Sequence, residues 1–400
     1  MKIGICTFGC DGGKSGISRY TIELIREFAA SGSEHQFEII AHEDEQHIFA
    51  PPAEHSANFK MLLYPAELRA TTKNILWHQT TLPRLCKERG FDVLFLPAGN
   101  RRLPYKCPCP TVGTVHDFSS LHVEGKYSLS HMIYIKKILP ALCRRLTRII
   151  TVSECSKRDI VHYARVPQDR VDVIYSAANK NVYKLYDPSE SRTVAQEKYG
   201  LNKPYLLYAS RIEHPGKNHV ALIRAFAALR SRGKLADRDL VFVGSDWSGA
   251  EAVHNEAQNS GCADAIKFLG FVPGADLPYL YSAAETFVFP SLYEGFGLPI
   301  LEAMQCGVPV ACSNRSALPE VAGDAALLFD AGNDESVAAA LERMTNDTIF
   351  RNGCIQKGLA RAAGFSWSIS AQQTMHSLEM AATGNNAPAH SGSSSSVSVF

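Results

Sequence analysis

Short apolar runs alternate with amphipathic stretches along most of the chain, a pattern typical of βαβ units and a parallel sheet. In the first half, short runs that are mainly apolar predict strands buried on both faces. These runs span residues 2–8, 37–42, 93–99, 111–117 and 148–154. The stretch 18–31, which follows the first run and a Gly-rich turn, has apolar residues at helical spacing. We therefore expect a Rossmann-like domain in this half.

The second half repeats the pattern. Its predicted strands span residues 205–211, 239–245, 265–272, 286–291, 308–313 and 326–330. The polar stretch 183–203 is rich in Pro, Ser and charged residues, so we interpret it as a connection between domains. The sequence thus predicts an α/β fold with two Rossmann-like domains. We expect these domains at 1–190 and 200–365, a final helix at 366–383, and a disordered Ser-rich tail at 384–400.

Composition excludes some classes of function. The hydrophobic share is 46% and the charged share 20%, which is typical of a globular protein. With 41 basic and 40 acidic residues the net charge is +1, so we expect no nucleic-acid partner. The N-terminus lacks the apolar segment of a signal peptide, and no run of eighteen apolar residues occurs. We therefore expect a cytoplasmic protein.

The eleven cysteines are scattered without a repeated spacing. In a reducing compartment they are best interpreted as small buried hydrophobic residues. One compact cluster, Cys107 and Cys109, has no second Cys or His pair near it at zinc spacing. We therefore expect no metal site.

The Gly-rich turn at 9–20 comes close to two phosphate-binding motifs but matches neither. A Walker A motif needs four residues between its first glycine and Gly-Lys-Ser, whereas only three residues lie between Gly9 and Gly13. The spacing also fails the dinucleotide fingerprint, so ATPase and dehydrogenase functions lose their main support. We expect the backbone of this loop and the following helix start to approach a bound group, although a flexible turn remains the alternative.

Ligands of open parallel sheets bind beyond the carboxyl ends of the strands, so residues at strand ends are candidates for ligand binding. His116 and Asp117 stand at such an end, and the sequence favours a functional and a structural histidine about equally. Arg211 directly follows another strand, and Lys217 comes six residues later. Each alone would be an ordinary surface cation, but together they can neutralise a diphosphate. No Asp-x-Asp motif offers a magnesium site, which fits that role.

The segment 291–310 places two carboxylates, Glu294 and Glu302, among Gly, Pro and apolar residues. We expect Glu294 in a loop and Glu302 in the first turn of a helix that starts at Pro299. Glycines beside Glu294 would let the backbone approach a ligand closely. A carboxylate can accept hydrogen bonds from two vicinal hydroxyls, as the acidic residue of dinucleotide-binding folds does with ribose. For Glu302 alone, compensation of the helix dipole is the alternative.

The chain resembles the family 4 retaining glycosyltransferases, whose GT-B fold has two Rossmann-like domains facing across a cleft. The resemblance covers nearly all of the chain and its most specific element is a glutamate, seven residues, then a glutamate, as in Glu294 and Glu302. It rests on the Gly-rich first turn, TVHD, ITVSECSKRDI, SRIEHPGKNH, FLGFVP and PSLYEGFGLPILEAMQCGVPV, in that order. It also implies that the final helix packs back on the N-terminal domain.

By this resemblance the protein binds a nucleotide diphosphate sugar and needs no metal or other cofactor. Glu302 would hold the ribose hydroxyls. The implied donor-binding residues are Gly16, Arg211, Lys217, Phe271, Val272, Glu294, Gly295, Phe296, Gly297, Leu298 and Glu302. The implied catalytic residues are His116, Arg211, Lys217 and Glu294. The implied acceptor-side residues are Gly12, Gly13, His116 and Asp117. The extra Lys14 and Ser15 depart from the commonest family pattern at the first turn.

The resemblance implies transfer of a hexose to a saccharide or lipid-linked acceptor with retention of configuration, as in exopolysaccharide or O-antigen assembly. The motifs SRIEHPGKNH and SALPEV favour mannose or a related sugar, and GDP over UDP. Two alternatives stay open: a two-domain protein that binds sugar without chemistry, and a hydrolase or epimerase acting on the nucleotide sugar.

Membrane contact is a separate expectation. The stretch 131–150 mixes apolar residues with five lysines and arginines, which suits the surface of an anionic leaflet. Pro140 interrupts this stretch, and a solvated helix face followed by a strand explains it equally well. The expected location is therefore the cytoplasm, with peripheral contact at the inner face of the membrane as one interpretation.

Overall fold

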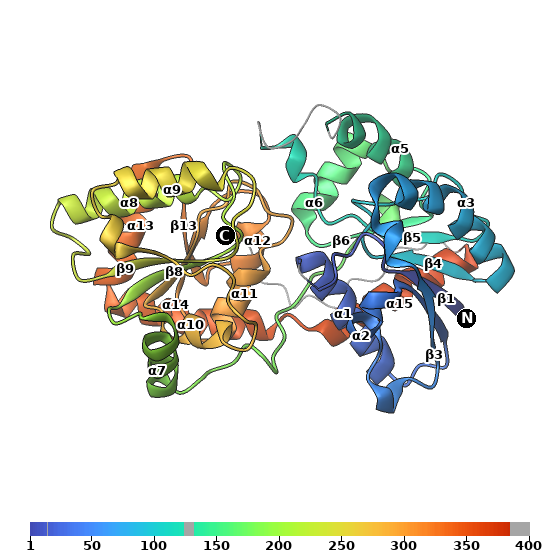
Figure 1. Cartoon of the computed structure of the whole chain (residues 1–400), viewed down its shortest axis with the longest axis horizontal. Helices are drawn as coiled ribbons and strands as arrows, with labels where there is room; N and C mark the ends of the chain where they lie inside the picture. Colours follow the sequence, from blue (N-terminus) through green and yellow to red (C-terminus); the bar gives the residue numbers. More distant parts are fainter. Residues whose placement is uncertain (14, 124–131, 385–400) are drawn as a thin grey trace. The chain divides into compact units, whose positions relative to one another are not determined.

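The computed structural model describes residues 1–13, 15–123 and 132–384. The chain divides into two compact units (Figure 1). The N-terminal unit contains Met1–Asp117, Tyr134–Tyr175 and the segment from Trp367 onward. The C-terminal unit contains Phe118–Ile133 and Ser176–Ser366.

The described part of the N-terminal unit contains a seven-stranded parallel sheet in the order β3-β2-β1-β4-β5-β6-β7. Its strands are β1 (Lys2–Cys6), β2 (Gln36–His42), β3 (Phe59–Tyr64), β4 (Val93–Leu96), β5 (Thr111–Thr114), β6 (Arg148–Thr151) and β7 (Val171–Val173). Five of them, β1, β2, β4, β5 and β6, are buried along almost their whole length, as their apolar runs predict.

The helices of this unit lie on both faces of the sheet. They are α1 (Gly16–Ala30), α2 (Gln46–Phe49), α3 (Thr71–Arg89), α5 (Leu139–Cys143), α6 (Glu154–Asp159) and α15 (Trp367–Thr383). The C-terminal helix α15 packs beside α1 and against β4, β5 and β6, whereas α3, α5 and α6 lie on the other side (Figure 1). Ser377 Oγ donates a hydrogen bond to Asp172 Oδ2 at 2.6 Å, which joins α15 to β7.

The C-terminal unit contains a six-stranded parallel sheet in the order β10-β9-β8-β11-β12-β13. Its strands are β8 (Tyr205–Ala209), β9 (Asp239–Val243), β10 (Ile266–Phe268), β11 (Thr286–Phe289), β12 (Val310–Ser313) and β13 (Ala326–Phe329). Its helices are α7 (Pro188–Tyr199), α8 (His219–Ser231), α9 (Ala250–Asn259), α10 (Leu277–Ala283), α11 (Leu298–Gln305), α12 (Leu318–Ala322), α13 (Asp334–Asn346) and α14 (Thr348–Ala363). Figure 1 shows α8, α9 and α13 on one side of this sheet and α10, α11 and α14 on the other.

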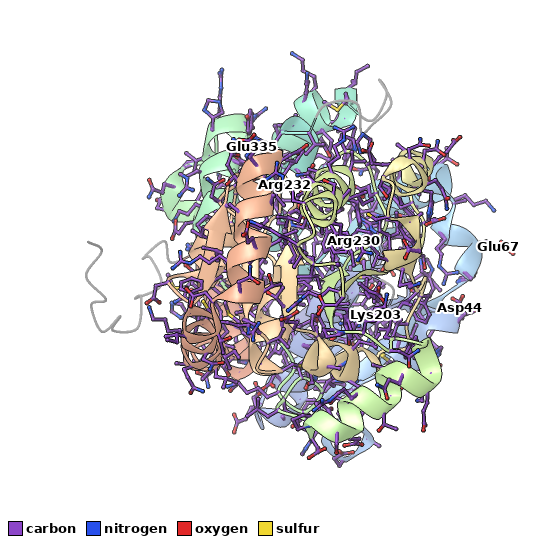
Figure 2. All side chains as sticks on the ribbon, turned by 90° about the vertical axis from the view of Figure 1, so that its left-hand side faces the viewer. Asp44, Glu67, Lys203, Arg230, Arg232 and Glu335 are labelled. Carbon is purple, nitrogen blue, oxygen red and sulfur yellow. The ribbon has the colours of Figure 1, made fainter. Side chains whose placement is uncertain are left out.

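Hydrogen bonds from one arginine close the turn between α8 and β9. The guanidinium of Arg230 donates to the carbonyl oxygens of Leu235, Ala236 and Arg238 at 3.0, 2.9 and 3.0 Å. The next basic residue, Arg232, is exposed, and both side chains are marked in Figure 2. One cation of this turn is therefore structural and the other is solvated.

The stretch 183–203, which we expected to be a connection between domains, contains helix α7. Asp187 caps this helix by accepting hydrogen bonds from the backbone of Ser189 and Glu190, and Pro188 takes the first helical position. Gly200 ends the helix with φ of 67°. The Pro and Ser residues that suggested a loop are thus the start of a helix, and the boundary between the units lies earlier, at Tyr175.

Each sheet has a point where the strand order reverses direction, and ligands of open parallel sheets bind at such points. In the N-terminal unit this point lies between β1 and β4, and in the C-terminal unit between β8 and β11. The loops that follow these four strands carry most of the predicted site residues. The topology therefore places the candidates where the fold favours ligand binding.

Two fully buried histidines predict acid sensitivity of the fold. Burial lowers the pKa of His219 to about 3 and that of His78 to about 4, because desolvation opposes the charged imidazolium. Below pH 6.5 the unfolded chain takes up protons at these positions while the folded chain does not, so stability falls as pH falls. We expect each histidine to lower the free energy of unfolding by about 2 kcal/mol between pH 7.5 and pH 5.

Urea unfolding at both pH values checks this expectation. The loss should be smaller in a His219→Asn variant, which cannot take up that proton. An unchanged pH dependence in this variant would contradict the prediction for His219.

Candidate functional site

Two loops meet at the strand-order reversal of the C-terminal unit, one after β8 and one after β11. The backbone N–H of Leu292 donates to the carbonyl oxygen of Gly216 at 3.0 Å. The hydroxyl of Tyr208, at the core of β8, donates to the carbonyl oxygen of Lys217 at 2.8 Å and lies 3.2 Å from Ser291 Oγ. These bonds hold the two loops in one fixed arrangement.

Asn218 strengthens the same junction. It stands in the left-handed region, with φ of 59°, which asparagine tolerates better than most residues. Its side-chain amide donates to the carbonyl oxygens of Pro290 and Ala331, at 3.2 and 2.8 Å. Asn218 therefore fixes the backbone directly beside Lys217.

The structure brings two predicted site residues into direct contact. The ammonium of Lys217 donates to Glu294 Oε1 at 2.6 Å, with side chains that are 18% and 16% exposed. The backbone N–H of Glu294 donates to Ser316 Oγ at 2.9 Å, which fixes the loop. An ammonium has three N–H donors. Lys217 can therefore bind a ligand oxygen without releasing Glu294.

Arg211 has a different set of neighbours. Its guanidinium lies over the ring of Trp247, 4.9 Å from the centroid, and 3.5 Å from Glu213 Oε2. The Arg211 side chain is 49% exposed, and Trp247 is 58% exposed. The buried carboxylate of Glu213 and the indole face both orient the cation. Arg211 is thus available to an anionic ligand on its solvent side.

Trp247 gives a test of this arrangement. An exposed cation–π contact contributes about 0.5–1 kcal/mol. We therefore expect Trp247→Ala to lower kcat/KM for the sugar donor about two- to fivefold, whereas Trp247→Phe retains most of the activity. Steady-state kinetics of both variants measures this. Equal losses in the two variants would mean that the aromatic face does not position Arg211.

Glu302 lies deeper in α11 than we predicted. The helix begins at Leu298, so Glu302 falls in its second turn rather than its first. The side chain is 4% exposed, and the hydroxyl of Tyr281 donates to Glu302 Oε2 at 3.1 Å. Burial, together with the charge of Glu302, raises the pKa of Tyr281 well above its ordinary value, so the phenol remains a donor. Because the helix dipole acts mainly in the first turn, dipole compensation does not explain this carboxylate.

The glycines before α11 allow close approach of the backbone. Gly297 is the N-cap of α11 with φ of 107°, and a Cβ there would lie 2.7 Å from Leu318 Cδ2. No side chain caps this helix start, which suits contact with an anion. The Phe296 ring packs inside, 6.0 Å from that of Phe365. Gly295 and Phe296 are buried, so a ligand would meet their backbone.

Two of the implied donor-binding residues, Phe271 and Val272, differ sharply in exposure. Phe271 is 77% exposed, whereas Val272 is 6% exposed. Phe271 can therefore offer a ring to a ligand, and Val272 supports the segment from below. The neighbouring Gly244 has φ of 144°, and a Cβ there would lie 2.0 Å from the carbonyl oxygen of Ser210. Only glycine permits this approach of the loop after β9 to the loop that carries Arg211.

In the N-terminal unit, the Gly-rich loop surrounds a carboxylate of its own. Asp11 Oδ1 accepts hydrogen bonds from the backbone N–H of Ser15 at 2.9 Å and from Ser18 Oγ at 2.7 Å. Burial of Asp11 opposes its charge, but these bonds outweigh burial and lower its pKa. Arg101, from the loop after β4, donates to the carbonyl oxygen of Gly9 at 2.8 Å. The start of α1 thus already holds an anion.

Two of the three glycines that we predicted to line this loop lie in the left-handed region that favours glycine. Gly12 and Gly13 have φ of 63° and 86°, and Gly16 is the first residue of α1. Among the described residues, a Cβ on Gly16 would meet no atom within 4 Å. Lys14, the departure from the family pattern, lies outside the described residues.

His116 is held in one orientation at the end of β5. Its Nε2 lies 2.9 Å from the carbonyl oxygen of Pro97 and therefore carries the proton, which leaves Nδ1 as the acceptor. Burial lowers the pKa of His116, so the ring is neutral at physiological pH. Asn100 binds the backbone N–H of His116 and the carbonyl oxygen of Asp117, so it fixes both predicted residues.

Sequence reasoning missed the residues that position this site. They are Asn100, Tyr208, Asn218, Trp247, Tyr281, Ser291 and Ser316. Tyr208 carries a usable signal, because a tyrosine in a fully buried strand needs a partner for its hydroxyl. Tyr281 lies in helix α10 and the others lie in loops, where the pattern of apolar residues does not reveal their partners.

Comparison with known proteins identifies the family of the chain. The family model described as Glycosyl transferases group 1 matches residues 191–361, and the model described as Glycosyltransferase Family 4 matches residues 14–181. O-antigen chain mannosyltransferase B of Escherichia coli is 31% identical over 385 residues, which cover 95% of this chain and 100% of that protein. Serotype-specific mannosyltransferase WbdA of Escherichia coli is 30% identical over 268 residues, which cover 66% of this chain but 32% of WbdA.

Solved structures share the fold. The crystal structure of HepE from Anabaena, in complex with UDP and glucose, matches with a TM-score of 0.75 at 20% identity and covers 95% of this chain and 99% of HepE. The prediction of an α/β chain with two Rossmann-like units of the GT-B type is confirmed. The full-length match to a relative, together with the two family models, shows that the chain belongs to the glycosyltransferases of group 1 and family 4.

Proposed function

We propose that the protein transfers mannose or a related hexose from a nucleotide diphosphate sugar, with GDP favoured over UDP, to a saccharide or lipid-linked acceptor in polysaccharide assembly. The observation that carries this proposal is the Lys217–Glu294 contact at the reversal point of the second sheet. The mannosyltransferase relatives support the choice of sugar. HepE, which shares the fold, is in complex with UDP and glucose, so UDP is the alternative nucleotide to test.

The chemistry follows from where charge develops. When the bond between the sugar and the diphosphate breaks, negative charge builds on a phosphate oxygen. Lys217 and Arg211, held by Glu294 and Trp247, provide fixed cations for that charge. Fixed groups stabilise the transition state without reorganisation, which raises kcat. This arrangement supports departure of the diphosphate without a metal ion.

Neither carboxylate suits a nucleophilic role. Glu294 is paired with Lys217, and Glu302 accepts the hydroxyl of Tyr281. We therefore assign Glu294 to hydroxyls of the transferred sugar and Glu302 to the ribose. Without an enzymic nucleophile, retention of configuration requires attack from the face that the diphosphate leaves, with the leaving phosphate accepting the proton of the acceptor hydroxyl. The neutral His116 would contact the transferred sugar.

A donor screen with product analysis tests the proposal. Thermal unfolding of the protein is measured with GDP, UDP, ADP and dTDP and their common sugars, beside Glu302→Gln and the exposed control Glu335→Gln (Figure 2). We expect GDP-mannose to stabilise the native chain and the control, but not Glu302→Gln. Preference for UDP would overturn the donor assignment, and no stabilisation by any nucleotide would overturn the site.

Analysis of the reaction products distinguishes sugar transfer from the alternative functions. Transfer extends a mannose-terminated acceptor and releases nucleoside diphosphate, whereas a hydrolase releases free sugar. An epimerase changes the sugar on the nucleotide, and a binding protein returns the donor unchanged. Only the first result agrees with the proposal.

We also propose that the N-terminal unit contacts an anionic membrane surface. Within the part of the chain that the structure describes, no helix combines the length and apolar character needed to cross a bilayer. In the expected stretch, Lys136 and Lys137 are exposed beside Ile138, which is 46% exposed. Arg148 departs from the expectation: it is 1% exposed and pairs with Asp172 at 2.7 Å. His131 lies outside the described residues.

Vesicle sedimentation tests this contact. Each basic residue near an anionic surface contributes about 1 kcal/mol. A Lys136→Glu and Lys137→Glu double variant should therefore bind vesicles containing phosphatidylglycerol at least about 30-fold more weakly than the native chain. The exposed Arg232→Glu control in the other unit should bind normally. Equal binding by all three proteins would contradict the proposal.

A further inference from the structure

Three cysteine side chains meet in the N-terminal unit, away from the loops of the candidate site. Cys86 lies on α3, and Cys107 and Cys109 lie in the segment that leads into β5. The three sulfur atoms lie within 4.8 Å of one another, and the Cys107 and Cys109 sulfurs are 3.6 Å apart. Cys86 is buried, whereas the other two are partly exposed.

These separations suit a shared metal ion. Three sulfurs bound to one ion at about 2.3 Å would lie about 3.8 Å apart in tetrahedral geometry and about 4.0 Å apart in a trigonal plane. The observed limits include both values, so small side-chain rotations would complete the coordination. Among the described residues, this is the one group of three or more Cys, His, Asp or Glu whose ligand atoms lie close enough together for an ion.

The surroundings also suit such a site. A cavity of about 530 Å³ is lined by residues 104–111 and 144–147, which include both partly exposed cysteines. It gives an ion a route to the sulfurs and space for a water as a fourth ligand. Lys106, Arg144 and Arg145 also line it. Three thiolates and one divalent ion carry a net charge of about −1, which these cations would compensate.

A hydrogen-bonded scaffold already holds the cysteine segment against α3. The side-chain amide of Gln79 donates to the carbonyl oxygen of Leu103 at 3.1 Å, and its oxygen accepts from the backbone N–H of Tyr105 at 2.7 Å. The sulfur positions therefore do not depend on a flexible loop. An ion would add a second link between the same two segments.

We propose that Cys86, Cys107 and Cys109 bind one thiophilic divalent cation, of the Zn²⁺ class, that links α3 to the segment before β5. On binding, each thiol releases its proton to solvent and forms one sulfur–metal bond, with no change of oxidation state. The sequence did not reveal this site, because Cys86 stands 21 residues before Cys107 and outside any compact motif. The site is structural and separate from the residues assigned to glycosyl transfer.

Cobalt titration tests the proposal without an activity assay. The reduced, metal-free full-length protein is titrated with Co²⁺ under anaerobic conditions. The charge-transfer band from cysteine sulfur to cobalt is followed in the near ultraviolet. We expect one equivalent per chain to produce the band. Cys86→Ser and Cys109→Ser should lose it. Cys155→Ser, a control at a partly exposed cysteine of the same unit, should retain it.

A second measurement avoids the risk that a variant misfolds. The native protein is alkylated with and without Zn²⁺, and the modified cysteines are mapped by mass spectrometry. Slower modification of Cys107 and Cys109 in the presence of Zn²⁺ would support the site. Absence of the cobalt band, a band that survives in Cys86→Ser, or a disulfide among the three cysteines that forms in place of metal binding would overturn it.

Discussion

Lys217→Met is expected to lower kcat for sugar transfer about 100- to 1000-fold while the protein remains folded. Removing one fixed donor from the charge that develops in a transition state typically costs about 2.7–4 kcal/mol. Lys217 is such a donor, because Glu294 and the backbone bond from Tyr208 hold it at the reversal point of the sheet. The loss should appear mainly in kcat, since the charge on the leaving phosphate grows only as the bond breaks.

Two controls make this result specific. Lys203→Met removes an exposed lysine of the same unit and should leave kcat unchanged (Figure 2). Lys217→Arg keeps the charge but replaces a compact ammonium by a planar guanidinium, so partial activity is expected. Thermal unfolding checks that the unpaired Glu294 has not destabilised the fold. A loss below tenfold in Lys217→Met, with normal folding, would remove Lys217 from the catalytic residues.

Glu302→Gln is expected to weaken donor binding about 100-fold. Each hydrogen bond to a charged group contributes about 1.5–3 kcal/mol to the free energy of binding. A carboxylate that binds two ribose hydroxyls accepts two such bonds. The variant is suited to this test because Gln still accepts the hydroxyl of Tyr281, so the buried contact survives. Titration calorimetry with GDP measures the loss.

The ligand itself supplies the matched control. If Glu302 binds the ribose, the native protein should prefer GDP to 2′-deoxy-GDP, and this preference should disappear in Glu302→Gln. Equal affinity of the native protein for the two nucleotides would show that Glu302 acts elsewhere. A weaker affinity in the variant with the preference intact would indicate general damage to the site.

Local pattern was sufficient to predict the continuously buried strands and the residues at their ends, but it missed β3 and β7, which are only partly buried. Continuous apolar runs identified β8 and β11, and the rule for parallel sheets then selected Arg211, Lys217 and Glu294. The same rule indicated the segment of Glu302, but placed that residue one turn too early, because Pro299 is the second residue of α11 and Leu298 the first. A shift of one residue at a helix start is enough for this error.

Other features depend on contacts between distant segments. The stretch around α7 has loop-forming residues, yet Asp187 and Pro188 use them as a cap. Arg148 looked like a surface cation, but its partner Asp172 lies on the neighbouring strand. Tyr281 and Cys86 gain their meaning only from residues that the fold brings to them. Such pairings cannot be obtained from the periodicity of one segment.

The most direct test of the central claim is hydrogen–deuterium exchange of the native protein with and without GDP. The claim is that the loops after β8 and β11 of the C-terminal unit hold the nucleotide diphosphate. It predicts slower exchange in peptides covering 210–219 and 290–303 when GDP is bound. Protection confined to other segments, or no protection at saturating GDP, would contradict it.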